Sequence, residues 1–241
     1  MRCDHWPEIP PREIHAFRAF GEHGVAYLND RLEGKPLERM RAHEPDYSEF
    51  PEKVREEIRG QRASNNRHTA ARLLGDLGKD AAAAIPFLEK AANEEDWFIK
   101  GGAKVALMKI RNESIDPLLN ELTSTLGHPN LYRTAIMVGQ FGPQAEKAVP
   151  VLLEMLENPE TMDAHALDVL GMIGLRPEKS VPALAGFLDH PIRAHRQKAI
   201  TALMSFGKHN EKVLPTLQSA IKDKDPFVSF RAKWIIGMLN R

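Results

Sequence analysis

Apolar residues recur at helical spacing in short segments of the chain, and glycine and proline separate these segments. Leu152, Leu153 and Leu156 share one face of a helix with 3.6 residues per turn, and Val181 shares a face with Leu184 in the same way. The pattern predicts amphipathic helices of roughly a dozen residues, an ordinary length in globular proteins. The sequence therefore predicts an all-α protein.

Prolines and glycines recur at a fixed period. Prolines stand 31, 33, 32 and 33 residues apart, at Pro86, Pro117, Pro150, Pro182 and Pro215. A glycine stands eight residues before four of them, at Gly78, Gly142, Gly174 and Gly207. Glycine ends a helix by adopting the left-handed conformation, and proline fits the first turn of the next helix. Each repeat is thus predicted to contain a first helix that ends at the glycine and a second helix that starts near the proline.

A second proline series is predicted to open the first helix of the following repeats. Its members are Pro129, Pro159, Pro191 and Pro226, and two of the residues before them, Asn158 and Asp225, are good N-caps. The last of these helices, Pro226–Leu239, is expected to close the array, with Trp234 sealing the final repeat.

The helix ends resemble those of the HEAT-repeat family, especially the short bacterial form of phycobilisome-lyase-like proteins. That family ends its first helix in Leu-Gly or Ile-Gly and opens its second with Ala-Val-Pro-x-Leu; the matching pairs here are Leu77-Gly78, Phe141-Gly142, Ile173-Gly174 and Phe206-Gly207. The resemblance covers about residues 64 to 241 and departs at Lys109–Arg111, where the glycine is absent, and at Asp163, where a basic residue is missing. It implies a right-handed α-solenoid of about six HEAT-type helical hairpins plus a closing C-terminal helix.

Three regions are predicted within a single solenoid domain. Residues 1–33 form a degenerate N-terminal capping repeat, in which Gly21 lines up with the stop glycines. Residues 34–63 form a polar insert with one short helix, Pro51–Arg59, and residues 64–241 form the regular array. The insert is interpreted either as a connector or as a lid or partner hook.

Composition narrows the class of protein. The 42% of apolar residues suffices for a continuous core, and the 33 basic and 33 acidic residues balance, unlike those of a dedicated nucleic-acid binder. Cys3 is the only cysteine, which excludes an intrachain disulfide and a multi-cysteine metal site. No apolar run suits a secretory signal or a membrane span, so a cytoplasmic location is expected, although a signal peptide removed upstream would leave the same sequence.

No catalytic motif is present in the sequence. It has no phosphate-binding Gly-x-x-x-x-Gly-Lys loop, no Gly-x-Ser-x-Gly elbow and no His-Glu-x-x-His helix. HEAT-type iron hydroxylases of the deoxyhypusine kind carry repeated His-Glu pairs, and this chain has one, His43-Glu44. We therefore predict no enzyme activity, no catalytic residue, no metal and no cofactor.

Charge is unevenly distributed along the repeats. Residues 112–190 hold 4 basic and 11 acidic residues, whereas residues 191–241 hold 10 basic and 3 acidic ones. The basic end is either a site for an anionic partner or a solvated face with the usual repeat arginines. The candidate anionic-partner patch consists of Arg193, Arg196, Lys198, Lys208, Lys212, Arg231 and Lys233.

An apolar row is predicted on the second helices, at the residue after each proline and four positions later. If these helices line the concave face of the solenoid, the row would receive a partner protein; otherwise it packs between neighbouring helices. The candidate contacts are Phe87, Leu118, Val151, Met155 and Phe187.

The sequence thus predicts a non-enzymatic scaffold that binds another protein on the concave face of its second helices. One alternative is a HEAT-like DNA-binding protein or DNA glycosylase, which the acidic middle disfavours; Trp97 and Trp234 are its aromatic candidates. Another is a structural subunit that associates with its own copies. Neither membrane nor nucleic acid is the expected partner.

Overall fold

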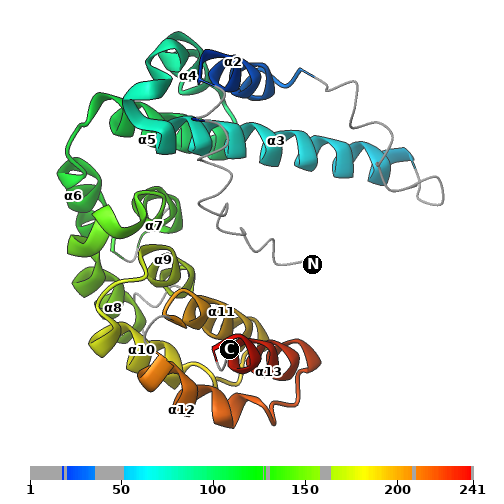
Figure 1. Ribbon diagram of the computed structural model, residues 1–241, viewed down its shortest axis with the longest axis vertical. Coiled ribbons are helices and arrows are strands. Elements are labelled where there is room, and N and C mark those ends of the chain that lie inside the picture. The colour runs from blue at the N-terminus through cyan, green and yellow to red at the C-terminus, as the bar shows by residue number, and fades with distance from the viewer. Residues whose placement is uncertain are drawn as a thin grey trace. The chain divides into compact units, whose positions relative to one another are not determined.

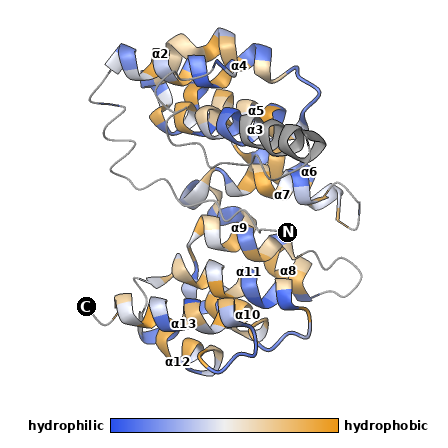
Figure 2. Ribbon diagram, turned by 90° about the vertical axis from the view of Figure 1, so that its right-hand side faces the viewer, coloured by the Kyte–Doolittle hydropathy of each residue, from blue (hydrophilic) through white to orange (hydrophobic). Residues whose placement is uncertain are grey.

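The structure is a computed structural model of the chain. It describes residues 18, 21–35, 52–126, 128, 131–157, 164–207 and 210–239, and for residues 52–63 and 210 it describes the backbone only. These residues form helices and short connections and contain no strand. Each helix in Figure 2 carries both hydrophilic and hydrophobic residues, as the period of the sequence predicts. The chain is an all-α solenoid of helical hairpins, which confirms the predicted fold class.

The chain divides into two compact units, Met1–Ser114 and Ile115–Arg241, where the sequence predicts one solenoid domain. The elements of unit 1 are α2 (Gly21–Leu32), α3 (Glu52–Leu77), the 3₁₀ helix η2 (Gly78–Ala84), α4 (Ile85–Ala91) and α5 (Trp97–Arg111). The helix η2 connects α3 to α4, and α2 and α5 each pack against both of these helices (Figure 1). Leu28, Leu74 and Leu88 lie at the centre of its apolar core.

Unit 2 has two layers of helices. Its elements are α6 (Asp116–Ser124), α7 (Leu131–Gly139), η3 (Gly142–Ala148), α8 (Val149–Glu157), α9 (His165–Ile173), α10 (Pro177–Gly186), α11 (Arg193–Met204), α12 (Asn210–Ala220) and α13 (Pro226–Leu239). Figure 1 shows the first helices α7, α9, α11 and α13 on the inner side of the curve that this unit follows and the second helices α8, α10 and α12 on the outer side.

The helix stops follow the glycine pattern with one exception. Gly78, Gly142 and Gly174 have φ of 60°, 57° and 63°, the left-handed conformation predicted for them. Asn112 takes the same conformation, with φ of 56°, at the helix end where the sequence has no glycine. The prediction is wrong for Gly207, which does not have a positive φ.

The prolines start the second helix in three repeats. Pro86, Pro117 and Pro150 stand in the first turn of α4, α6 and α8, as predicted. Pro182 and Pro215 lie inside α10 and α12 instead, so the predicted helix starts are wrong there. In α10 the earlier Pro177 supplies the first-turn proline, which moves the start of the helix upstream.

Glycines in the first helices allow neighbouring repeats to approach closely. A Cβ built on Gly75 would lie 2.9 Å from the Cα of Ala106, and one built on Gly171 would lie 2.8 Å from the Cα of Ala202. A Cβ on Gly139 would lie 2.9 Å from the sulfur of Met172. The first helices therefore pack almost backbone to backbone, which places them on the inner side of unit 2 and spreads the second helices apart.

The N-terminal region differs from the predicted division. α3 runs without a break from Glu52 to Leu77, so the short helix Pro51–Arg59 and the boundary between residues 63 and 64 are wrong. Gly60 alone does not end the helix, since one interior glycine costs only about 1 kcal/mol. α2 packs on α3 and α4, and residues 36–51 of the insert lie outside the described residues.

The N-cap prediction is confirmed at Asp225. The Asp225 carboxylate accepts hydrogen bonds from the backbone N–H groups of Phe227 and Val228, both at 3.1 Å, and so caps α13. Asn158 lies outside the described residues.

Candidate functional site

The predicted row on the second helices divides into buried and partly exposed members. Leu118 and Met155 are buried in the core, with exposed fractions of 6% and 0%, so the packing interpretation applies to them and the contact prediction does not. Phe87, Val151 and Phe187 are partly buried and keep some surface. Because the second helices form the outer layer of unit 2, the prediction that they line a concave face is wrong there.

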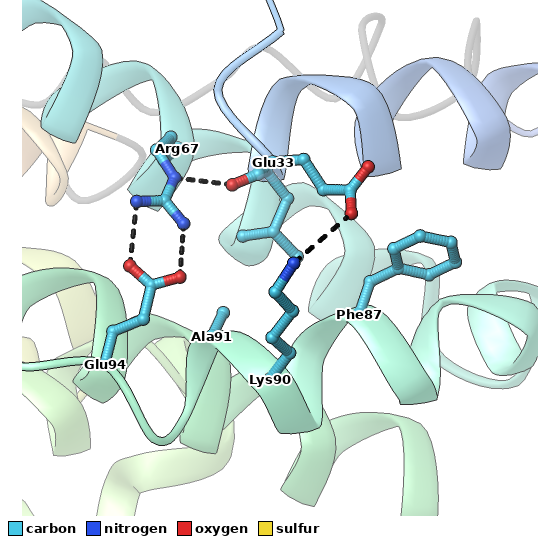
Figure 3. A pocket seen from close by; sticks show the side chains of 7 residues that line it. Glu33, Arg67, Phe87, Lys90, Ala91 and Glu94 are labelled. Atoms are coloured by element: carbon cyan, nitrogen blue, oxygen red, sulfur yellow. Dashed lines mark hydrogen bonds and ion pairs between the residues drawn. The ribbon is translucent and has the colours of Figure 1, made fainter.

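Phe87 borders a cavity of about 210 Å³ between the end of α2 and α4 (Figure 3). Its other lining residues are Leu32, Glu33, Arg67, Lys90, Ala91 and Glu94. Phe87 and Lys90 reach from α4 towards Glu33, which follows α2, and the Lys90 ammonium lies 3.8 Å from the Glu33 carboxylate. This volume is below that of ordinary small-molecule sites.

The charged groups of this cavity pair with one another. The Arg67 guanidinium makes two hydrogen bonds to the Glu94 carboxylate and donates a third, of 2.5 Å, to the Leu32 carbonyl. Arg67 therefore joins α3 to the end of α2 and to the turn after α4. The charge and the N–H donors of Arg67 are therefore paired within the fold, so we assign this bidentate arginine a structural role.

A larger groove lies between the second helices α8 and α10 in unit 2. Its volume is about 470 Å³, and its lining residues are Pro150, Leu153, Glu154, Glu157, Glu178, Lys179, Pro182 and Ala183. Three glutamates face one lysine, so the rim has a net charge of −2 beside an apolar floor. We call this surface the α8–α10 groove.

The sequence did not identify the residues of this groove. The helical spacing predicts that Leu153 shares an apolar face with Leu152 and Leu156, and the proline offset points to Val151, two positions away, as the contact. The acidic bias of residues 112–190 was the available signal, because the glutamates of the groove belong to that segment.

Three of the seven residues in the predicted basic patch form ion pairs within the described part of the fold. Arg196 makes hydrogen bonds of 2.8 and 3.2 Å to the Asp223 carboxylate, and both side chains are at least nine-tenths buried. Lys198 pairs with Asp168, and Arg193 pairs with Asp225 at 2.5 Å. The patch prediction is therefore wrong for Arg196 and Lys198, because counting charges along a sequence does not reveal their partners.

The remaining predicted cations have different surroundings. Lys212 and Lys233 are exposed on α12 and α13, and Lys208 lies outside the described residues. Arg231 packs over the rings of Phe227 and Trp234. Trp234 itself is 42% exposed, so the prediction that it seals the last repeat is wrong.

A family model described as HEAT repeats matches residues 149–234, from the first residue of α8 to Trp234 in α13. Residues 149–234 are therefore similar to HEAT repeats. HEAT repeats generally mediate protein–protein interaction and are typically non-enzymatic. A similar solved structure is the crystal structure of an engineered protein from the Northeast Structural Genomics Consortium, with 18% sequence identity and a TM-score of 0.38, over 73% of this chain and 91% of that one. No curated protein matches the chain.

His68, His190 and His195 each contact another aromatic ring. His68 is buried and stacks on Phe98 with 3.9 Å between ring centroids; burial, and to a smaller extent the nearby Arg72 cation, lowers the pKa of His68 to about 3. The rings of His190 and His195 lie 4.4 Å apart. The described part of the chain holds no group of three or more His, Cys, Asp or Glu side chains that could bind a metal. None of its helices combines the length and apolar character needed to cross a bilayer.

Proposed function

We propose that the chain is a non-enzymatic protein-binding module whose α8–α10 groove receives a segment of another protein. The observation that carries the proposal is the composition of this groove, in which an open apolar floor lies beside an acidic rim on the outer layer of the HEAT repeats. An apolar groove of this kind suits a helix or an extended segment that inserts side chains.

The charge of the groove specifies the chemistry of its partner. Glu154, Glu157 and Glu178 are exposed, and only Lys179 opposes them on the rim. A segment with lysine or arginine beside apolar residues would complement this field, which raises the rate of association and rejects acidic competitors. Leu153 and Ala183 are partly exposed in the floor and would contact the apolar side chains of the partner.

Affinity measurements on groove variants test this proposal. A partner recovered with the wild-type chain is purified, and its Kd is measured by calorimetry against wild type, Leu153→Asp and the double variant Glu154→Lys/Glu178→Lys. Each change is expected to weaken binding at least tenfold, about 1.4 kcal/mol or more. Two matched controls, Glu211→Lys on the exposed start of α12 and Phe230→Asp on α13, are expected to bind normally.

Circular dichroism of each variant must match that of wild type, since a lost helix would also remove binding. If the partner binds the groove variants as tightly as wild type, or if only Phe230→Asp weakens it, the groove is not its site. Saturable binding of duplex DNA that the groove variants leave unchanged would favour the nucleic-acid alternative.

A further inference from the structure

One face of α13 points away from the core of unit 2 and exposes four large apolar side chains. We call it the outer face of α13. Phe227, Phe230, Trp234 and Met238 have exposed fractions of 37%, 67%, 42% and 41%. At about 100° of rotation per residue, they fall within roughly 80° of the helix circumference. Val228, Ala232 and Ile235 are buried on the opposite side, so α13 is apolar on two faces, and the described residues of unit 2 bury only the second. Single exposed apolar residues are ordinary, but an aligned stripe of four marks an interaction surface.

A glycine within this face repeats a packing feature of the preceding helices. Gly237 is the third residue from the end of α13, and Gly171 is the third from the end of α9. They are 237 − 171 = 66 residues apart, two periods of 33. A Cβ on Gly171 would lie 2.8 Å from the next first helix, whereas one on Gly237 would meet nothing within 4 Å. The outer face of α13 thus has the small residue that elsewhere admits a neighbouring helix at close range.

Two cations flank the stripe. Arg231 lies next to it on one side and Lys233 on the other, by the same helical rotation, and Pro226–Leu239 contains no Asp or Glu. The Arg231 guanidinium lies 5.2 Å from the ring centroid of Phe227 and 5.8 Å from that of Trp234. Its Nε is buried and has no hydrogen-bond acceptor among the described residues.

Among the described residues, Arg231 lacks the carboxylate partner that the repeat arginines Arg67 and Arg196 have. Arg67 and Arg196 are each held by two hydrogen bonds to a carboxylate, of Glu94 and Asp223 respectively. No described carboxylate lies within ion-pair distance of Arg231, and burial lowers its pKa because desolvation disfavours the cation. A carboxylate brought to this position would complete the pairing that the other arginines have inside the fold.

We propose that the outer face of α13 (Phe227, Phe230, Arg231, Lys233, Trp234, Gly237 and Met238) binds an amphipathic helix of another protein that carries carboxylates beside its apolar side chains. A second copy of α13 does not fit this face, because it would bring Arg231 and Lys233 against the same cations with no acidic residue on either helix. The surface is separate from the α8–α10 groove and has the opposite charge preference.

Two matched peptides test the proposal. Each is a capped, fluorescein-labelled 15-residue helix with leucine along one face and alanine at its centre; one carries glutamate along both flanks, and the other carries lysine there. Fluorescence anisotropy with the full chain measures their affinities. The glutamate peptide is expected to bind saturably and at least tenfold more tightly than the lysine peptide.

Variants of the full chain locate the binding. Trp234→Ala and Gly237→Leu are each expected to weaken binding of the glutamate peptide at least tenfold. Gly237→Leu does so because the leucine side chain fills the space above position 237. Arg231→Gln is expected to weaken the same binding several-fold and to reduce the salt dependence of its Kd. Leu153→Asp, in the α8–α10 groove, is expected to leave it unchanged, which separates this proposal from the proposed function.

Three outcomes would overturn the proposal. The first is no saturable binding of the glutamate peptide, and the second is equal affinity for both peptides. The third is a dimer of the wild-type chain in sedimentation velocity that Trp234→Ala abolishes, which would assign the face to a second copy instead.

Discussion

The close packing of the first helices makes a sharp prediction for two glycines. Gly171 and Gly237 are both third from the end of a first helix, but only Gly171 faces a neighbouring helix. A Cβ on Gly171 would lie 2.8 Å from the Cα and 2.9 Å from the Cβ of Ala202, and neither atom belongs to a flexible side-chain end. Gly171→Ala therefore forces α9 and α11 apart.

The expected difference in the free energy of unfolding follows from comparing Gly171→Ala with Gly237→Ala. Glycine to alanine in a helix gains up to about 1 kcal/mol of helix propensity, and this gain is common to both sites. Overpacking a tight contact costs typically about 1–3 kcal/mol. We expect Gly237→Ala to be neutral or stabilising and Gly171→Ala to be less stable than Gly237→Ala by about 1–3 kcal/mol.

Urea unfolding followed by circular dichroism measures this difference, with unchanged m-values as the check that both variants unfold in the same way. If the two variants differ in stability by less than about 0.5 kcal/mol, within the ordinary range for surface changes, the close-packed register of these helices is wrong.

Three further predictions concern single side chains. Arg196→Ala strands the buried carboxylate of Asp223 and is expected to cost about 3–5 kcal/mol, whereas Arg176→Ala, which breaks an exposed ion pair with Glu146, costs at most about 1 kcal/mol in urea unfolding; equal costs would contradict the assignment of Arg196 to the core. His68 has a pKa near 3 when folded and 6.5 when unfolded, so between these values the unfolded chain binds a proton that the folded protein does not, and stability falls as pH falls through this window. From pH 7 to pH 5 this loss approaches about 2 kcal/mol, and His68→Gln should remove it; an unchanged pH dependence would refute the buried neutral imidazole. Asn112 has φ of 56°, a left-handed conformation that asparagine tolerates because its side chain can hydrogen-bond locally and that alanine does not. Asn112→Ala is therefore expected to lower the free energy of unfolding by about 1 kcal/mol, and Asn112→Gly is not. An alanine variant as stable as wild type would contradict the left-handed helix end.

The glycines and prolines that recur at the helix ends and starts explain why the fold could be predicted. Glycine and proline act through the local backbone, so Gly142 and Pro150 fix a helix end and a helix start wherever the repeat is placed. The same logic failed at Pro182, because the upstream Pro177 was an equally good first-turn residue. It also failed to show that Asn112 replaces the missing glycine, although asparagine tolerates the left-handed conformation.

The surfaces could not be predicted in the same way, because they depend on the distance between neighbouring helices. Met155 and Leu153 stand two positions apart in one apolar helix, but the first is fully buried and the second lines the groove. Two positions are about 200° of helical rotation, so these side chains lie on nearly opposite faces of α8, and the fold decides which of the two faces stays open. The charge count failed at Arg196 for a similar reason, since Asp223 lies 27 residues away in sequence and within 2.8 Å in the fold.

Site-specific photo-crosslinking tests most directly whether the α8–α10 groove holds a partner protein. A photoreactive phenylalanine replaces Leu153 in the groove, and in a second variant it replaces Glu211 on the exposed surface of α12 as a control. We expect position 153 to crosslink to a segment of another protein with lysine or arginine beside apolar residues, and position 211 not to crosslink. Crosslinks of equal yield at both positions, or a segment rich in acidic residues at position 153, would contradict it.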